Sequence, residues 1–98
     1  MDSEWDEAKR EANILKHGVD FVAAVKIFDG PFIETEDRRR NYGEQRLLAL
    51  GELGGVVFRV VYIWRGERRR IISARRARRD ERRAYNAGVP PTARENGR

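Results

Sequence analysis

Arginine is the residue type through which this chain could do chemistry. The 98 residues include 21 lysines and arginines, of which three are lysines, together with a single histidine, His17, and no cysteine. A guanidinium can fork onto phosphate or carboxylate, whereas an ammonium offers only a point charge. Because the chain has one histidine, a pair of histidines cannot divide the acid and base work of catalysis. Neither a histidine and cysteine cluster nor a close group of carboxylates is present to hold a metal. Arginine-based stabilisation of a polyanion is the chemistry that remains.

The charges are divided unevenly along the chain. Residues 1–37 contain ten acidic side chains against four basic ones, whereas residues 65–83 contain ten arginines against three acidic side chains. This asymmetry favours a polyanionic partner over a generic role of the charges in solubility. The alternative is that the arginine excess reflects only genome composition.

Length and hydropathy limit the class of protein. A chain of 98 residues allows one domain, which we place at residues 1–88. No apolar run approaches the roughly 20 residues that a membrane-spanning helix needs, and the N-terminus is acidic where a signal peptide is basic. We therefore expect a cytoplasmic protein with no membrane partner.

A β-hairpin over Val56–Ala77 is expected to organise the fold. Its first strand is almost wholly β-branched, aliphatic or aromatic, so both of its faces are apolar and it should lie centrally in a sheet. The turn at residues 64–67 leads to a return strand in which Ile71 and Ile72 lie between arginines. If side chains alternate strictly, Ile72 and Ala74 share one face and Ile71 the other. Such a hairpin presents a cationic rim.

Two helices are expected before the sheet. Trp5, Ala8, Ala12 and Leu15 recur at helical spacing and predict a helix over residues 6–17, with its apolar stripe toward the core and Gly18 after its last turn. Asp20 can cap a second, shorter helix, which residues 29–31 end. Both tryptophans, Trp5 and Trp64, are expected to be core anchors.

The remaining elements complete an α+β fold. Short strands are expected at residues 32–36 and 45–50, with residues 51–55 as a turn, so that four strands form a mostly antiparallel sheet. A basic helix is expected over residues 77–85 and a disordered tail over residues 89–98. Because arginines repeat at i,i+4 in that last helix, we expect it to be held weakly against the sheet.

Several motifs along the chain resemble those of the BrnT family of bacterial type II toxins. The matching segments occur in order, from residue 5 to about residue 85: WDEAKxxxNxxKHGVxF at residues 5–21, FDxP at 28–31, ExR at 44–46 and RIISARRA at 70–77. The resemblance implies a compact RelE-like fold and a ribonuclease that arrests translation. It also implies a cognate BrnA-like antitoxin, which would wrap the toxin and contribute DNA binding, so that operator DNA is contacted only indirectly.

The resemblance and the charge pattern together give candidate site residues. Arg46 and Arg75 lie in the ExR and RIISARRA segments, and Arg65 closes the central strand, so these three are candidate phosphate clamps or transition-state stabilisers. Glu44 is a candidate base or a carboxylate that positions an arginine. Lys16 and His17 are candidates for RNA binding or proton transfer, although cations in the last turn of a helix are also explained by the helix dipole.

Further residues are candidates for RNA binding rather than catalysis. They are basic or aromatic side chains of the hairpin and the last helix: Arg70, Arg76, Arg79 and Tyr85. Tyr42 could likewise stack on a base. No cofactor or metal is expected. Two function classes remain open at this point, an RNA-cleaving toxin and a non-catalytic basic module that binds nucleic acid or a ribosome surface.

Overall fold

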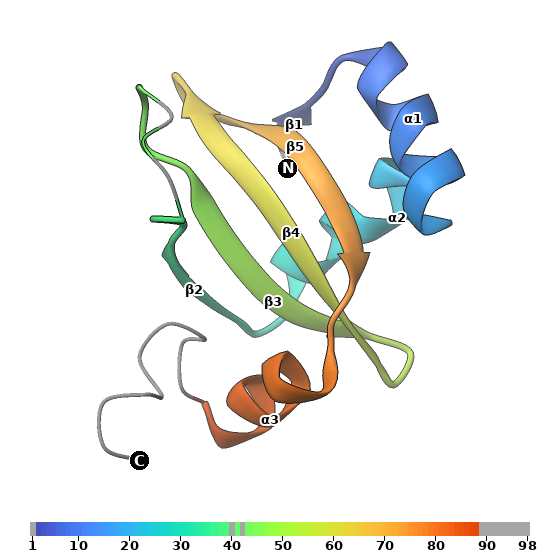
Figure 1. Ribbon diagram of the computed structural model, residues 1–98, viewed down its shortest axis with the longest axis vertical. Helices are drawn as coiled ribbons and strands as arrows, with labels where there is room; N and C mark the ends of the chain where they lie inside the picture. Colours follow the sequence, from blue (N-terminus) through green and yellow to red (C-terminus); the bar gives the residue numbers. More distant parts are fainter. Residues whose placement is uncertain (1, 40, 42, 89–98) are drawn as a thin grey trace.

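The computed structural model describes residues 2–39, 41 and 43–88 and contains one mixed sheet with helices on both sides (Figure 1). The expected tail at residues 89–98 and the candidate Tyr42 lie outside the described residues. The order of the strands across the sheet is β1-β5-β4-β3-β2. The elements are β1 Ser3–Glu4, α1 Glu7–His17, α2 Phe21–Ala24, η1 Val25–Asp29, β2 Phe32–Glu36, β3 Leu47–Leu53, β4 Val56–Arg65, β5 Arg68–Arg76 and α3 Arg79–Ala87.

The sheet confirms the mostly antiparallel arrangement and adds one strand to it. β2, β3, β4 and β5 pair as an antiparallel meander with β4 in the middle. The additional strand, β1, pairs parallel to β5 through Ser3 with Arg69 and Glu4 with Arg70. Two residues are too few to show an alternating pattern, so the sequence carried no signal for this strand. The four-strand expectation was therefore one strand short.

Helix α1 begins and ends as expected but docks differently. The Asp6 carboxylate accepts a hydrogen bond from the amide of Ala8 at 2.8 Å, and Gly18 ends the helix with φ 70°. The expected apolar stripe toward the core is wrong, because the side chain of Leu15 is 89% exposed. The buried residue of α1 is Asn13, whose side-chain amide donates to the carbonyl of Ala74 at 2.7 Å and accepts from its amide at 3.2 Å. The Asn13 side chain thus bonds the backbone of Ala74 as a neighbouring strand would, and these two bonds fix α1 to the edge of β5.

The β3–β4 turn lies later than the sequence suggested. β3 continues to Leu53, and the turn is made by Gly54 and Gly55, both with positive φ. Gly51 is inside the strand rather than in the turn, because a Cβ there would lie 2.6 Å from the Cβ of Ile27 in η1. Close approach of η1 to the sheet, and not a turn, requires this glycine.

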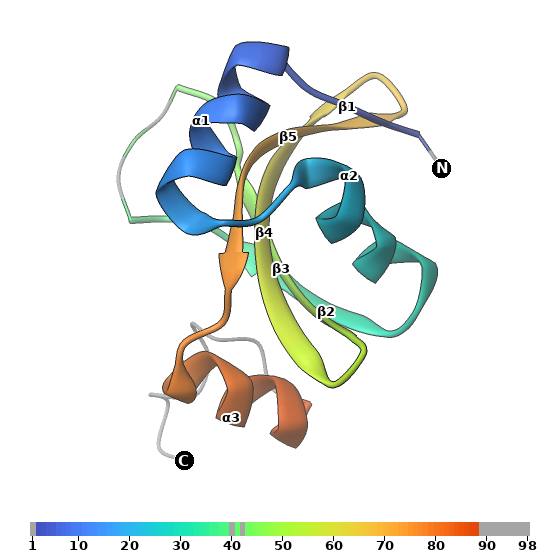
Figure 2. The same cartoon turned by 90° about the vertical axis from the view of Figure 1, so that its right-hand side faces the viewer.

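The two faces of the sheet carry two separate apolar clusters. Figure 2 shows the sheet from its side, with α2 on one side and α3 on the other. The first face packs under α2 and η1 around Phe21, Ile27 and Tyr62, all at most 1% exposed. The second face packs around Leu50 and Val61 and meets α3. The prediction that both faces of β4 are largely apolar is confirmed, although Trp64 near its end is 46% exposed and is not a core anchor.

A bulge in β5 changes the expected alternation. Val61 pairs with Ser73 and Tyr62 with Ile71, so Ile72 is an extra residue on β5. As a result Ile71 and Ala74 both belong to the first cluster, whereas strict alternation had placed them on opposite faces. The bulge brings Ile72 to the second face. Within the described part of the chain, no helix combines the length and the apolar character that a membrane span requires.

Candidate functional site

Two arginines lie side by side on the second face of the sheet. Arg59 of β4 and Arg75 of β5 are direct cross-strand partners. Arg59 interrupts the apolar residues Val57 and Val61 on its face and is only 5% exposed. Like charges directly opposite each other on a sheet are destabilising, so this pair needs a compensating anion.

Glu81 of α3 is that anion. Its two carboxylate oxygens accept hydrogen bonds from the two terminal nitrogens of Arg75, both at 2.9 Å, and one lies 3.5 Å from Nε of Arg59. The same carboxylate accepts the backbone amide of Arg78 at 2.8 Å, at the N-terminus of the helix. Burial alone would raise the pKa of Glu81, but the hydrogen bonds from Arg75 and Arg78 lower it below its ordinary value. Glu81 is therefore an ionised anchor.

These contacts correct the expectation for the last helix. It spans Arg79–Ala87 rather than residues 77–85, and Gly88 ends it. The expectation that α3 is held weakly considered only its arginine repeats. A buried carboxylate that binds two strands and closes the first helical turn holds it instead.

Burial makes Arg59 an unusual cation. Its pKa is lowered to about 10, first by burial and then by the nearby charges of Arg75 and Arg39, while Glu81 and Asp37 act in the opposite direction. Asp37 itself is 5% exposed and accepts two hydrogen bonds at 2.7 Å from Arg39, which lower its pKa. The second face therefore holds a network of alternating charges around Arg59.

His17 is brought next to this network by α1. Asn13 and His17 are four residues apart and share one face of the helix, and Asn13 is bound to Ala74, the residue before Arg75. Burial lowers the pKa of His17, and the positive charges of Lys16, Arg75 and Arg59 lower it further. Its imidazole is consequently neutral at pH 7 and can accept a proton.

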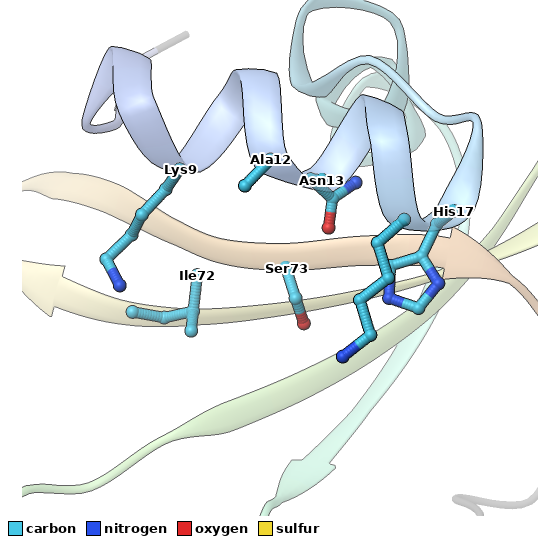
Figure 3. A pocket seen from close by; sticks show the side chains of 7 residues that line it. Lys9, Ala12, Asn13, His17, Ile72 and Ser73 are labelled. Carbon is cyan, nitrogen blue, oxygen red and sulfur yellow. The ribbon is translucent and has the colours of Figure 1, made fainter.

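A pocket of about 230 Å³ opens between α1 and β5 at this point. Figure 3 shows the Lys9 ammonium group, the His17 ring and the Ser73 hydroxyl directed to the same side of α1, and Lys16 also lines the pocket. Cations and a hydroxyl around one pocket suit a chain of phosphates. The pocket is lined by Lys9, Ala12, Asn13, Lys16, His17, Ile72 and Ser73.

The other residues predicted for catalysis lie outside this cluster. Glu44 is exposed in the connection between β2 and β3. Arg46 is half-buried before β3, and its carbonyl accepts the amide of Asp37 at 2.8 Å, which joins it to the network through the backbone. Arg65 ends β4 at the tip of the β4–β5 hairpin, six residues along the strand from Arg59.

The residues predicted for RNA binding are distributed over several elements. Arg70 forms an ion pair with Glu4 at 3.0 Å across β5 and β1. Arg76 is exposed at the end of β5, and Arg79 is exposed at the first position of α3. Tyr85 packs against the second apolar cluster and donates its hydroxyl to the carbonyl of Pro31 at 3.4 Å.

Sequence reasoning missed Arg59 and Glu81. The signal for Arg59 was its position, because a lone arginine on one face of an otherwise apolar central strand requires a partner or a function. Glu81 had no local signal beyond being an acid in a basic helix. The described residues contain no group of three or more histidine, cysteine or acidic side chains placed to hold a metal ion.

Comparison with known proteins identifies the family. Residues 5–81 match the family described as "Ribonuclease toxin, BrnT, of type II toxin-antitoxin system". No curated protein matches the chain. The match covers strands β2 to β5, helices α1 and α2 and the start of α3, and the α+β order is consistent with a RelE-like fold. A type II toxin implies an RNA substrate and a cognate antitoxin. The chain belongs to the BrnT family of ribonuclease toxins of type II toxin-antitoxin systems.

Proposed function

We propose that this toxin cleaves RNA without a metal ion at the surface where His17 and Lys16 lie beside the largely buried pair Arg59 and Arg75. The observation that carries the proposal is the cross-strand arginine pair beside a histidine whose pKa is lowered. Arg59, Arg75 and Lys16 carry three positive charges against the one negative charge of Glu81, so this region attracts phosphate and repels a metal ion. Cleavage in the cytoplasm would arrest translation until the antitoxin binds.

The proposed reaction is transfer of a phosphodiester to the neighbouring ribose hydroxyl. His17 accepts the proton of the 2′-hydroxyl as its oxygen bonds to phosphorus, and the bond from phosphorus to the 5′-oxygen breaks. Lys16, at the same pocket, donates a proton to the leaving 5′-oxygen. The products are a 2′,3′-cyclic phosphate and a 5′-hydroxyl end. Arg75 and Arg59 stabilise the charge that develops on the phosphorane oxygens.

Glu81 acts in this proposal as a positioning residue. It accepts hydrogen bonds from both terminal nitrogens of Arg75, which fixes the plane of the guanidinium. Glu44, exposed in the connection before β3, supplies no group to the proposed cluster. Hydrogen bonds lower the pKa of Glu81 and make its carboxylate a weak base, so His17 rather than Glu81 is assigned to accept the proton.

The experiment is a cleavage assay with purified toxin and a structured RNA in excess EDTA. Arg75→Ala should lower the rate roughly tenfold to a thousandfold, because each group that stabilises developing phosphate charge contributes roughly 1.4–4 kcal/mol. Lys26→Ala removes a cation from η1 on the other side of the sheet and should cleave normally. Loss of activity in EDTA, or normal cleavage by a folded Arg75→Ala variant, would overturn the proposal. Binding of RNA without new ends would instead favour a non-catalytic module.

We propose further that the antitoxin is BrnA-like and brings the DNA-binding part, so that operator DNA is contacted indirectly. The family supports this pairing, and the toxin's arginines offer an anionic antitoxin segment the same charges as RNA. Expression of the toxin alone should arrest growth, and expression with the adjacent gene should restore it. Normal growth at verified expression of the folded toxin would contradict the proposal.

A further inference from the structure

An exposed tryptophan, Trp64, stacks on a half-buried arginine, Arg69, near the tip of the β4–β5 hairpin. Trp64 and Arg69 are cross-strand partners, and the guanidinium carbon of Arg69 lies 4.7 Å from the centre of the Trp64 ring. Although 46% of Trp64 is exposed, its ring is held edge-on to Tyr62 at 5.7 Å with an interplanar angle of 85°. The indole is therefore fixed in orientation while part of it faces solvent.

The cation beneath Trp64 is held by aromatic rings. The guanidinium carbon of Arg69 also lies 4.0 Å from the centre of Phe28, 5.2 Å from Tyr62 and 5.6 Å from Phe32. Its Nε is buried and has no hydrogen-bond partner among the described residues. Four ring faces around one cation immobilise it and with it the tryptophan that covers it.

The surroundings of Trp64 carry exposed positive charge. Arg65 and Arg68 flank the turn, are cross-strand partners and are both exposed, whereas Arg70 is already paired with Glu4. Glu67 in the turn offsets part of this charge. A flat aromatic ring that is held rigidly, with cations beside it, is how proteins bind single-stranded nucleic acid: the ring stacks on bases and the cations pair with phosphates.

We propose that Trp64, stacked on Arg69, binds one unpaired base of single-stranded RNA, with Arg65 and Arg68 on the adjacent phosphates. This platform is distinct from the arginine pair at Arg59, because Trp64 contacts the Tyr62 side of β4 and lies about 17 Å along the strand from Arg59. It rests on the RNA substrate of the family and not on the proposed cleavage site. The platform would select unpaired RNA and hold it while another segment is cut.

The test uses an oligonucleotide that cannot react. A single-stranded 2′-O-methyl oligonucleotide lacks the nucleophilic hydroxyl, so its binding is independent of cleavage. In a Trp5→Phe background, the fluorescence that remains comes from Trp64, and it should be quenched on binding by base stacking. An oligonucleotide with abasic positions should bind through its phosphates without quenching the indole.

Substitutions separate the base contact from the phosphate contacts. Trp64→Ala should weaken binding roughly fivefold to a hundredfold, and Trp64→Phe by less, because stacking contributes about 1–3 kcal/mol per base. Arg65→Ala and Arg68→Ala should keep the quenching and each reduce the slope of affinity against salt by about one. Leu15→Ala, at an apolar residue of α1 that is more exposed than Trp64, should bind normally.

Cleavage kinetics and binding together test whether Trp64 binds RNA. With RNA, Trp64→Ala should raise KM and leave the rate at saturation unchanged, whereas the arginine pair affects the rate at saturation. Unchanged oligonucleotide affinity in folded Trp64→Ala, or no quenching in the Trp5→Phe protein, would overturn the platform even if Arg75→Ala abolishes cleavage. Weakened binding of the antitoxin with unchanged binding of the oligonucleotide would show a protein contact and would equally overturn it.

Discussion

Strand β4 contributes apolar side chains to one face of the sheet and a buried charge to the other. On one side of β4, Val60 and Tyr62 are fully buried and pack with Phe21 in a continuous apolar cluster. On the other side, Arg59 divides the apolar residues and binds Glu81, where an aliphatic side chain would have fitted the pattern. The first face holds the fold together. The second face gives up apolar packing to keep charges in fixed positions, which is the arrangement that a phosphate-directed site needs.

Energetics support this division. Buried ion pairs add little net stability, because desolvation offsets their attraction, and replacing one by apolar residues is often neutral or stabilising. Removing only one member is costly, because it leaves an uncompensated charge. If the arginine pair were present for stability alone, an apolar pair would serve as well. A substitution on the first face should therefore leave the cleavage rate of the folded protein unchanged, whereas removal of the Arg59 charge on the second face should lower it.

The largest effect is expected at Glu81. Glu81→Ala leaves Arg59 and Arg75 facing each other without an anion and removes the cap of α3, so the free energy of unfolding should fall by roughly 3–5 kcal/mol. Denaturant unfolding measures the loss, and amide exchange over α3 should accelerate. Glu52→Ala, at an exposed carboxylate of β3, is the matched control and should change stability by less than about 0.5 kcal/mol. Equal stability of the two variants would show that α3 is held by other contacts.

A smaller effect is expected from overpacking the first face. Gly51→Ala places a methyl group against Ile27 and should cost roughly 1–3 kcal/mol of unfolding free energy. Because Ile27 belongs to the first cluster, the cleavage rate of the folded molecules should be unchanged. Thermal unfolding followed by single-turnover cleavage below the transition checks both parts. A folded Gly51→Ala protein that cleaves slowly would contradict the division between the faces.

The pH dependence should be modest in stability and clear in activity. The folded-state pKa of His17 is depressed below its ordinary value, so protonation opposes folding, and the stability it contributes is present above the unfolded-state pKa and lost as pH falls through the folded value. As a general base His17 must be neutral, so cleavage should decline on the same acid side, below about pH 6.5. His17→Gln should lower the rate and abolish this acid limb. An unchanged acid limb in that variant would assign it to another group.

Local chemistry made much of the fold predictable. The caps at Asp6 and Gly18, the β4–β5 hairpin and the glycine after α3 follow from residue types and spacing over a few positions. The two-residue strand β1, the bulge at Ile72 and the docking of α1 through Asn13 depend on partners distant in the sequence. Periodicity cannot reveal these, because a polar residue such as Asn13 reads as a solvent-facing position.

The candidate site was predictable only in part for the same reason. Arg75 and His17 were found through motifs that resemble the family, and the structure brings both to one surface. Arg59 and Glu81 were missed because the cross-strand register and the position of α3 create their contacts. Arg65 lies at the hairpin tip rather than in the arginine pair, and we propose that it binds RNA there.

The most direct test of the central claim is the single-turnover cleavage rate of Arg59→Met. Methionine keeps most of the volume and removes the buried charge, while Glu81 retains Arg75 as its partner. The account predicts a protein that is as stable as the original or more so, and that cleaves RNA roughly a hundredfold to a thousandfold more slowly. A stable Arg59→Met toxin that cleaves at the original rate would contradict the account, because the second face would then serve only to hold α3.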